Sequence, residues 1–133
     1  MAIQSAPIWD ESWKAAADLS GKQFYCVKLG STFNSVDVAS AATDLCVGIL
    51  QNKPTSGRGA NVRHLGISKA VSDGSGTSIA IGDRVGPNSS GKIVKKATAD
   101  YNCIGIALAA STADGTIIPV LMLPGLVFRT LAG

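Results

Sequence analysis

Short apolar segments alternate with glycine, proline and aspartate turn signals along most of the chain, which is the pattern of many short β-strands. Aspartate accounts for eight of the nine acidic residues and stands at turns such as Asp73-Gly74, whereas glutamate, which favours helices, occurs once. The pattern predicts an all-β domain. The expected strands cover residues 23–29, 36–39, 45–50, 60–71, 78–81, 84–85, 92–96, 103–110 and 117–123, with a tail or last edge strand at 126–131.

Two parts of the chain resemble each other. Residues 46–49 read Cys-Val-Gly-Ile and residues 103–106 read Cys-Ile-Gly-Ile, and each block is followed by a glycine and then an apolar run. We interpret the chain as a tandem repeat of one small β unit, covering 21–71 and 82–123 within a single domain at 21–133. A glycine inside a strand marks a bulge, a bend or a close backbone approach, so Gly48 and Gly105 predict a strongly curved barrel or sandwich.

Residues 1–20 differ from the rest and are predicted to form an N-terminal arm. Both tryptophans of the chain lie here, four positions apart, and a helix would place them on one face, although an extended arm is equally compatible. The arm is expected to dock on its own domain, a sister subunit or a larger partner. Aromatic residues are enriched at interface centres, so contact with a subunit or partner is favoured. The candidate contact residues are Ile3, Ile8, Trp9 and Trp13.

Composition supports a role within an assembly. Charged residues make up 16% of the 133 residues, against about 25% in typical globular chains. Either part of the surface is covered by other subunits, or the surface is rich in small residues. The net charge of +3 comes from scattered Lys and Arg, so no basic patch for nucleic acid is expected. The N-terminus has no signal-peptide pattern, and the longest uncharged apolar run, 116–128, contains two prolines and is too short to cross a bilayer as a helix.

The cysteines do not indicate a metal site. There are three of them, no CxxC spacing and a single histidine, and a zinc site needs a tighter set of ligands. Cys46 and Cys103 occupy equivalent repeat positions inside apolar runs, which favours buried, reduced thiols. A Cys46–Cys103 disulfide is the weaker alternative.

One segment has the outline of a phosphate-binding loop. Residues 86–92 match G-x-x-x-x-G-K, but Ile93 occupies the place of the Ser or Thr that would hold magnesium, and no helix-length segment follows. A hairpin turn at 87–91 explains these residues better. His64 shares a strand face with Val62 and Gly66 and has no visible catalytic partners, so a structural or interface role is favoured. No catalytic, cofactor-binding or metal-binding residue is predicted.

Taken together, these segments resemble a known family. The order runs from 8–13 (IWDESW) and 23–29 (QFYCVKL) through 47–54 (VGILQNKP) and 66–70 (GISKA), and then to 81–85 (IGDRV), 90–94 (SGKIV), 104–108 (IGIAL) and 118–121 (IPVL). It is similar to the small capsid decoration, or cement, proteins of tailed bacteriophages. The similarity extends over most of the chain and depends on the order and spacing of short apolar elements.

The resemblance implies a β-rich subunit, usually a homotrimer, that binds the major capsid protein shell on the outside of the virion and stabilises it by bridging capsomers. It implies no enzyme activity, no cofactor, no direct nucleic-acid contact and no membrane, with synthesis in the host bacterial cytoplasm. Two alternatives remain open: a receptor- or glycan-binding module on a virion or cell surface, and nucleotide hydrolysis at residues 86–92. Replacing both tryptophans, Trp9→Ala with Trp13→Ala, is expected to leave a folded protein that decorates shells poorly.

Overall fold

A computed structural model describes residues 5–96 and 102–123. Within these residues the chain forms nine strands and no helix, which confirms the all-β prediction. Each strand overlaps a predicted segment except the first, which lies in the predicted arm. The expected strand at 78–81 contributes one isolated bridge, between Ile79 and Ser111, and the predicted tail at 126–131 lies outside the described residues. The strands are β1 (Ala6–Ala15), β2 (Cys26–Leu29), β3 (Ser35–Val38), β4 (Gly48–Leu50), β5 (Gly59–Asp73), β6 (Arg84–Pro87), β7 (Ile93–Lys95), β8 (Gly105–Ala107) and β9 (Asp114–Met122).

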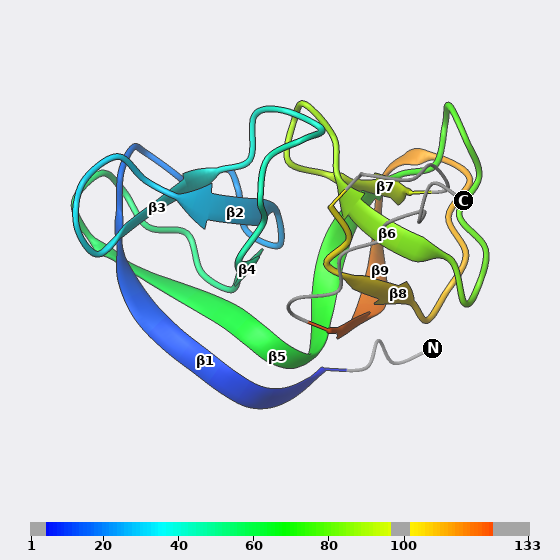
Figure 1. The fold of residues 1–133 in the computed structure, drawn as a ribbon, viewed down its shortest axis with the longest axis horizontal. Coiled ribbons are helices and arrows are strands. Elements are labelled where there is room, and N and C mark those ends of the chain that lie inside the picture. The colour runs from blue at the N-terminus through cyan, green and yellow to red at the C-terminus, as the bar shows by residue number, and fades with distance from the viewer. Residues whose placement is uncertain (1–4, 97–101, 124–133) are drawn as a thin grey trace, which may run out of the picture.

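The strands form one mixed sheet that closes twice on the long strand β5. Its order is β1-β3-β2-β4-β5-β7-β6-β8-β9, with additional pairings β1–β5 and β5–β9. Strands β1 to β4 therefore close a ring with the first half of β5, which we call the first barrel. Strands β6 to β9 close a ring with the second half of β5, which we call the second barrel. Figure 1 shows the two barrels side by side with β5 running from one to the other.

The two barrels have the same connectivity. In the first, β2 pairs antiparallel with both β3 and β4, and β3 pairs parallel with β1. In the second, β6 pairs antiparallel with both β7 and β8, and β7 pairs parallel with β5. We propose that the barrels are the two copies of the repeat inferred from the sequence. In this comparison β1 corresponds to the second half of β5, because each pairs parallel with the equivalent strand of its barrel, β3 or β7. The first copy then begins at β1, upstream of the predicted start at residue 21.

The repeated glycines allow close backbone approach, one of the roles predicted for them. A Cβ atom at Gly48 would lie 2.5 Å from both the Arg63 carbonyl oxygen and Cγ1 of Val62 on the next strand. A Cβ atom at Gly105 would overlap the carbonyl oxygen of Leu121 and lie 3.0 Å from Cγ1 of Val120. The same kind of contact therefore recurs at equivalent places in the two barrels.

Outside β5, the barrels are joined by hydrogen bonds of Gly91, Lys96 and Asn102 and by a core cluster that includes Cys26 of β2 and Ile93 of β7. The turn between β6 and β7 packs on β2, where the Gly91 carbonyl oxygen accepts the Cys26 N–H at 2.8 Å. The loop between β3 and β4 is held from the second barrel by two side chains. Lys96 Nζ donates to the Ala42 carbonyl oxygen at 3.1 Å, and Asn102 Nδ2 donates to the carbonyl oxygens of Thr43 and Asp44 at 2.8 and 3.0 Å. The first barrel therefore contacts the second through several elements.

The Asp44 carboxylate organises the loop between β3 and β4. It accepts the backbone N–H groups of Ser40 and Ala41 at 2.8 and 2.9 Å and lies 3.2 Å from Lys28 Nζ. The hydrogen bond from Ser40 and the neighbouring lysine lower the pKa of this carboxyl below its usual value. The loop that the second barrel holds is thus ordered from within.

The cysteines behave mainly as the sequence predicts. Among the described residues the three cysteines form no disulfide, so the alternative of a Cys46–Cys103 disulfide is wrong. Cys26 and Cys103 are buried, while Cys46 is half-buried and packs against the core cluster that contains Cys26. A hydrogen bond with Cys46 and burial raise the pKa of the Cys26 thiol. Burial lowers the pKa of Lys96, which lies beside this cluster.

Candidate functional site

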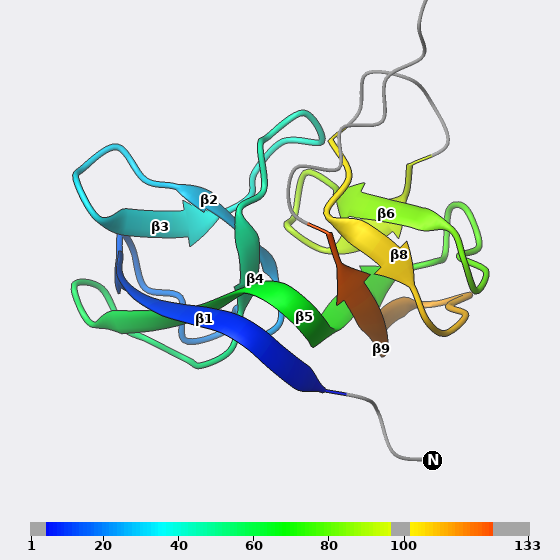
Figure 2. The same cartoon turned by 60° about the horizontal axis from the view of Figure 1, so that its bottom comes forward.

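The segment predicted to be an arm is a strand of the first barrel over residues 6–15. Strand β1 pairs antiparallel with the first half of β5 from Ala6↔Ile67 to Lys14↔Gly59, and its last two residues pair with β3. Figure 2 shows β1 lying along β5. The prediction of an arm is therefore not confirmed for these residues, because β5 and β3 supply the backbone partners that an extended segment needs. Of the two conformations left open, helical and extended, the structure has the extended one.

The two tryptophans of β1 surround His64 on β5. Trp13 donates its indole Nε1–H to His64 Nε2 at 3.0 Å, and the other ring nitrogen, Nδ1, lies 2.7 Å from the Val47 carbonyl oxygen. An indole nitrogen is only a donor, so Nε2 accepts and the proton resides on Nδ1 of a neutral imidazole. The ring centroids of Trp9 and His64 are 4.5 Å apart. His64 therefore holds β1 in place, the structural role favoured from the sequence.

An ion pair connects the same two strands. Asp10 and Arg63 are directly opposite each other, and the carboxylate binds the guanidinium with two hydrogen bonds of 2.8 and 3.1 Å. Arg63 also donates to Ser5 Oγ and to the Ile67 carbonyl oxygen. Its side chain is 9% exposed, against 25% for Asp10, so the pair is largely removed from water.

The predicted contact residues divide into two groups. Ile8 is 73% exposed and Trp9 is 49% exposed, so their side chains are available to another molecule. We call these two the β1 patch. Trp13 is half-buried and packs against the core of the first barrel, so its first contact is with its own domain. Ile3 lies outside the described residues.

Other large apolar side chains are also exposed on the described part of the chain. They are Leu29, Phe33, Leu45, Ile81 and Ile117. Phe33 is the extreme case at 98% exposed, and it lies in the turn between β2 and β3. Phe33 is not among the contact residues predicted from the sequence. The available signal was one aromatic residue inside an otherwise small and polar turn, residues 30–35.

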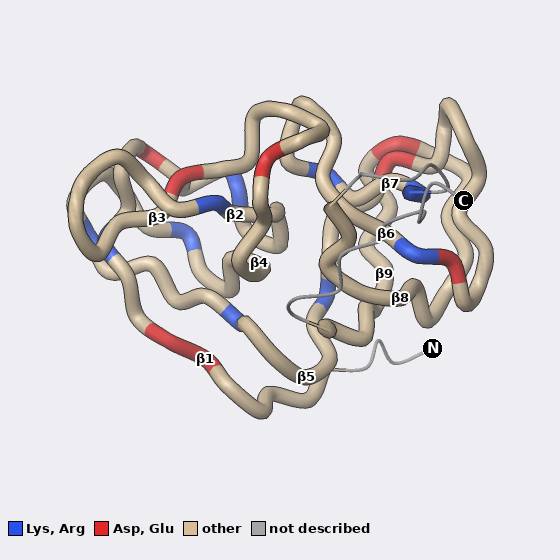
Figure 3. Tube along the Cα trace, viewed as in Figure 1, with Lys and Arg blue, Asp and Glu red and all other residues tan. Residues whose placement is uncertain are grey.

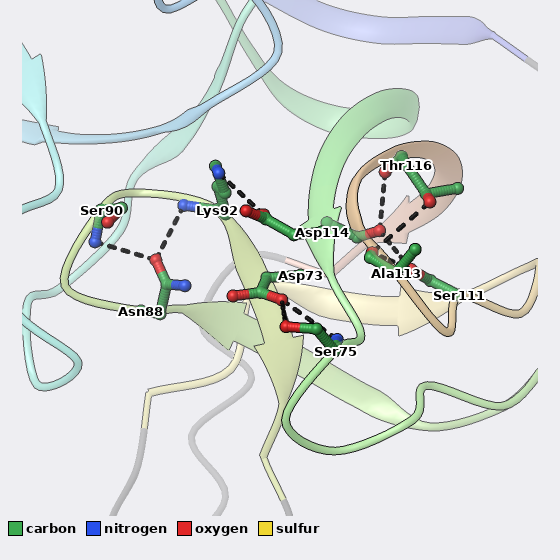
Figure 4. Close-up of polar contacts among 10 residues, drawn as sticks. Asp73, Ser75, Asn88, Ser90, Lys92, Ser111, Ala113, Asp114 and Thr116 are labelled. Carbon is green, nitrogen blue, oxygen red and sulfur yellow. Dashed lines mark hydrogen bonds and ion pairs between the residues drawn. The ribbon is translucent and has the colours of Figure 1, made fainter.

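The segment that resembles a phosphate loop is a hairpin turn, as predicted. It connects β6 to β7, which pair antiparallel from Val85↔Lys95 to Pro87↔Ile93. Asn88 Oδ1 accepts the backbone N–H groups of Ser90 and Lys92, and Lys92 Nζ binds the Asp114 carboxylate at 2.7 Å (Figure 4). This hydrogen bond raises the pKa of Lys92. The lysine therefore pairs with a carboxylate of its own chain, and strand β7 begins where a phosphate loop would begin a helix.

The charged residues are interspersed. Figure 3 shows Lys and Arg together with Asp and Glu in both barrels, and several of them pair with each other, as Lys95 does with Asp83 at 3.6 Å. The described residues contain no group of three or more His, Cys, Asp or Glu that could hold a metal ion, and no helix among them is long and apolar enough to cross a membrane. The features that stand out on this surface are exposed apolar side chains.

Comparison with known proteins gives a family and a fold. The model of the phage cement protein family matches residues 3–122. No curated protein matches the sequence. Among solved structures, the chain is similar to the N base of head fiber gp8.5 of bacteriophage phi29, with a TM-score of 0.66 and 13% sequence identity, over 87% of this chain and 94% of that chain. That likeness shows the fold. Since the family model extends over nearly the whole chain, this protein belongs to the phage cement protein family, as its resemblance to capsid decoration proteins predicted.

Proposed function

We propose that this protein binds the outer surface of a phage capsid shell and stabilises the shell by bridging neighbouring capsomers. The observation that carries the proposal is the match to the phage cement protein family over residues 3–122. We propose no catalytic role, because the family is structural and the segment that resembles a phosphate loop is a hairpin turn.

The build of the two barrels supports a bridging role. A protein that resists the separation of capsomers must transmit force between its contact points without deforming. Here the barrels share β5, and the second barrel also holds the first through Gly91, Lys96 and Asn102. Contacts distributed over several elements make independent movement of the barrels costly.

The mechanism proposed is mass action. A ligand that binds one of two states more tightly shifts the equilibrium toward that state. A cement protein that prefers the expanded shell over its precursor therefore stabilises the expanded shell. We propose that the protein acts as a homotrimer, because coupling several weak contacts in one particle increases the overall affinity through avidity.

Co-sedimentation tests the proposal. The protein is mixed with expanded shells and with precursor shells of the phage that carries its gene, and each mixture is centrifuged. We expect it to pellet with expanded shells and to remain in the supernatant with precursor shells. Absence from both pellets would contradict the proposed function. Equal binding to both would leave attachment intact but contradict stabilisation by preference for the expanded state.

The β1 patch gives the next prediction. Ile8→Ser with Trp9→Ala is expected to leave the fold intact, because both side chains are exposed and Trp13 keeps its hydrogen bond to His64. It is expected to weaken either shell binding or trimer formation roughly tenfold or more. Co-sedimentation measures the first and sedimentation equilibrium the second. The pair is preferable to Trp9→Ala with Trp13→Ala, since Trp13 contributes to the core. Unchanged binding and unchanged oligomeric state would exclude the β1 patch as a contact.

A further inference from the structure

The turn between β2 and β3 places one aromatic ring in water. Phe33 is 98% exposed and Leu29, at the end of β2, is 56% exposed. Burying a side chain such as Phe stabilises a protein by roughly 1.5–3 kcal/mol. The described fold leaves Phe33 unburied, so its ring makes no such contribution to stability. Small polar residues and glycine adopt the backbone conformations of a tight turn readily. The turn therefore does not require a phenylalanine.

The turn is held in one conformation. The Gly30 N–H donates to the Ser35 carbonyl oxygen at 2.8 Å, and the buried Ser35 hydroxyl donates to the Thr32 carbonyl oxygen at 2.7 Å. Thr32 Oγ1 lies 3.0 Å from the same hydroxyl. Asn34 has a φ of 61°, the left-handed conformation that asparagine tolerates in turns. Phe33 is therefore presented by an ordered turn, which reduces the entropy lost when it binds a partner.

An open hollow of about 420 Å³ lies beside this ring. Its apolar lining comes from Trp13, Leu29 and Phe33, and the rest of its wall is the turn of residues 30–35. A hollow lined by aromatic and aliphatic side chains accepts another apolar side chain, and such pockets form the centres of protein interfaces.

Two exposed cationic residues, Lys14 and Arg58, lie in segments next to the hollow. Lys14 is exposed and adjoins the hollow, because its N–H donates to the Asn34 carbonyl oxygen at 2.9 Å and it pairs with Ser35. Arg58 is exposed and close by in the fold, because its carbonyl oxygen accepts the N–H of Ala15, the residue after Lys14. Among the described residues neither side chain is in an ion pair with a side chain of this chain. The residues that line the hollow include no acidic side chain.

From this we infer that the Phe33 turn is a docking point for the capsid shell, taking an apolar side chain of the shell protein that has an acidic residue beside it. The apolar side chain occupies the hollow between Trp13, Leu29 and Phe33, and the acidic residue faces Lys14 and Arg58. This inference rests on the proposed function and adds a contact separate from the β1 patch. A subunit that bridges capsomers needs at least two such contacts.

Phe33→Ser is the test, with Ile81→Ser as the matched control. Ile81 is 73% exposed and lies in the second barrel, between β5 and β6, so its replacement removes comparable apolar surface elsewhere. Titration against expanded shells is expected to show a loss of affinity of roughly tenfold or more for Phe33→Ser and little change for Ile81→Ser. Phe33→Leu is expected to retain most of the affinity. Circular dichroism should show that all three variants are folded.

Lys14→Glu tests the charge requirement. We expect it to weaken binding at low salt, and the wild-type affinity to fall as salt is raised, because exposed charges are screened.

If the wild type binds shells and Phe33→Ser binds equally well, the inference is overturned while the proposed function stands. Equal losses for Phe33→Ser and Ile81→Ser also overturn it, since affinity would then follow general surface hydrophobicity. If the wild type binds no shells, the proposed function fails and this inference fails with it.

Discussion

Gly66→Ala is expected to lower the free energy of unfolding by about 3 kcal/mol or more, a large share of the roughly 5–15 kcal/mol available to a domain. Gly66 has a φ of 114°, a conformation that residues with a Cβ rarely adopt. A Cβ atom there would also overlap the carbonyl oxygen of Ala6 and lie 2.9 Å from the Ile8 nitrogen. The substitution therefore strains β5 and pushes β1 away from it at the same time.

The reason lies in the position of Gly66 within β5. It is paired with Pro7 of β1 and with Met122 of β9, so it lies where β5 passes from the first barrel to the second. The side chain of any other residue would point into the backbone of β1. Only glycine meets both the backbone angle and the close approach.

Gly57→Ala is the matched control. Gly57 has a φ of 80°, and a Cβ atom there would have no atom within 4 Å, so the change adds strain without overlap. It should cost about 1–2 kcal/mol. Urea unfolding followed by circular dichroism measures both changes. Tryptophan fluorescence reports on β1 in particular, because both tryptophans lie on it. Equal losses for the two variants would show that β1 is not pressed against Gly66.

The strands of the barrels could be predicted because their signals are local. Glycine, proline and aspartate mark the turns, and apolar runs lie between them, so the segment 60–71 became β5 (Gly59–Asp73) and 36–39 became β3 (Ser35–Val38). The close approach at Gly48 and Gly105 was one of the three roles that a glycine inside an apolar strand indicates, together with a bulge and a bend.

Strand β1 could not be assigned in the same way. Its tryptophans are four residues apart, which suits a helix, and register shifts between Pro7 and Asp10 disturb the two-residue alternation of a strand. Its extended form depends on β5, more than forty positions away in the sequence. The ion pair between Asp10 and Arg63 could not be predicted either, because the two residues lie on strands that are far apart in the sequence. Phe33 did have one, an aromatic residue in a polar turn, but exposure becomes visible only once the fold is known.

Asp10→Ala is expected to lower the free energy of unfolding by about 2–3 kcal/mol. The substitution leaves the Arg63 guanidinium, 9% exposed, with only neutral acceptors at Ser5 and Ile67. An unpaired cation in a largely buried site loses hydration without gaining a counter-charge. Because the pair joins β1 to β5, the loss should appear both in urea unfolding and in tryptophan fluorescence.

Asp114→Ala provides the comparison, because it removes a carboxylate from an ion pair of similar length, 2.7 Å against 2.8 Å. Asp114 is 53% exposed and Lys92 is 21% exposed, so the freed lysine can be hydrated and the loss should stay below about 1 kcal/mol. Adding Arg63→Met to the Asp10→Ala chain should recover part of the stability, since it removes the unpaired cation and keeps an apolar stem of similar length. If Asp10→Ala were as mild as Asp114→Ala, water would reach Arg63 in the folded protein. Strand β1 would then be held to β5 mainly by the hydrogen bond between Trp13 and His64 and by its backbone pairing.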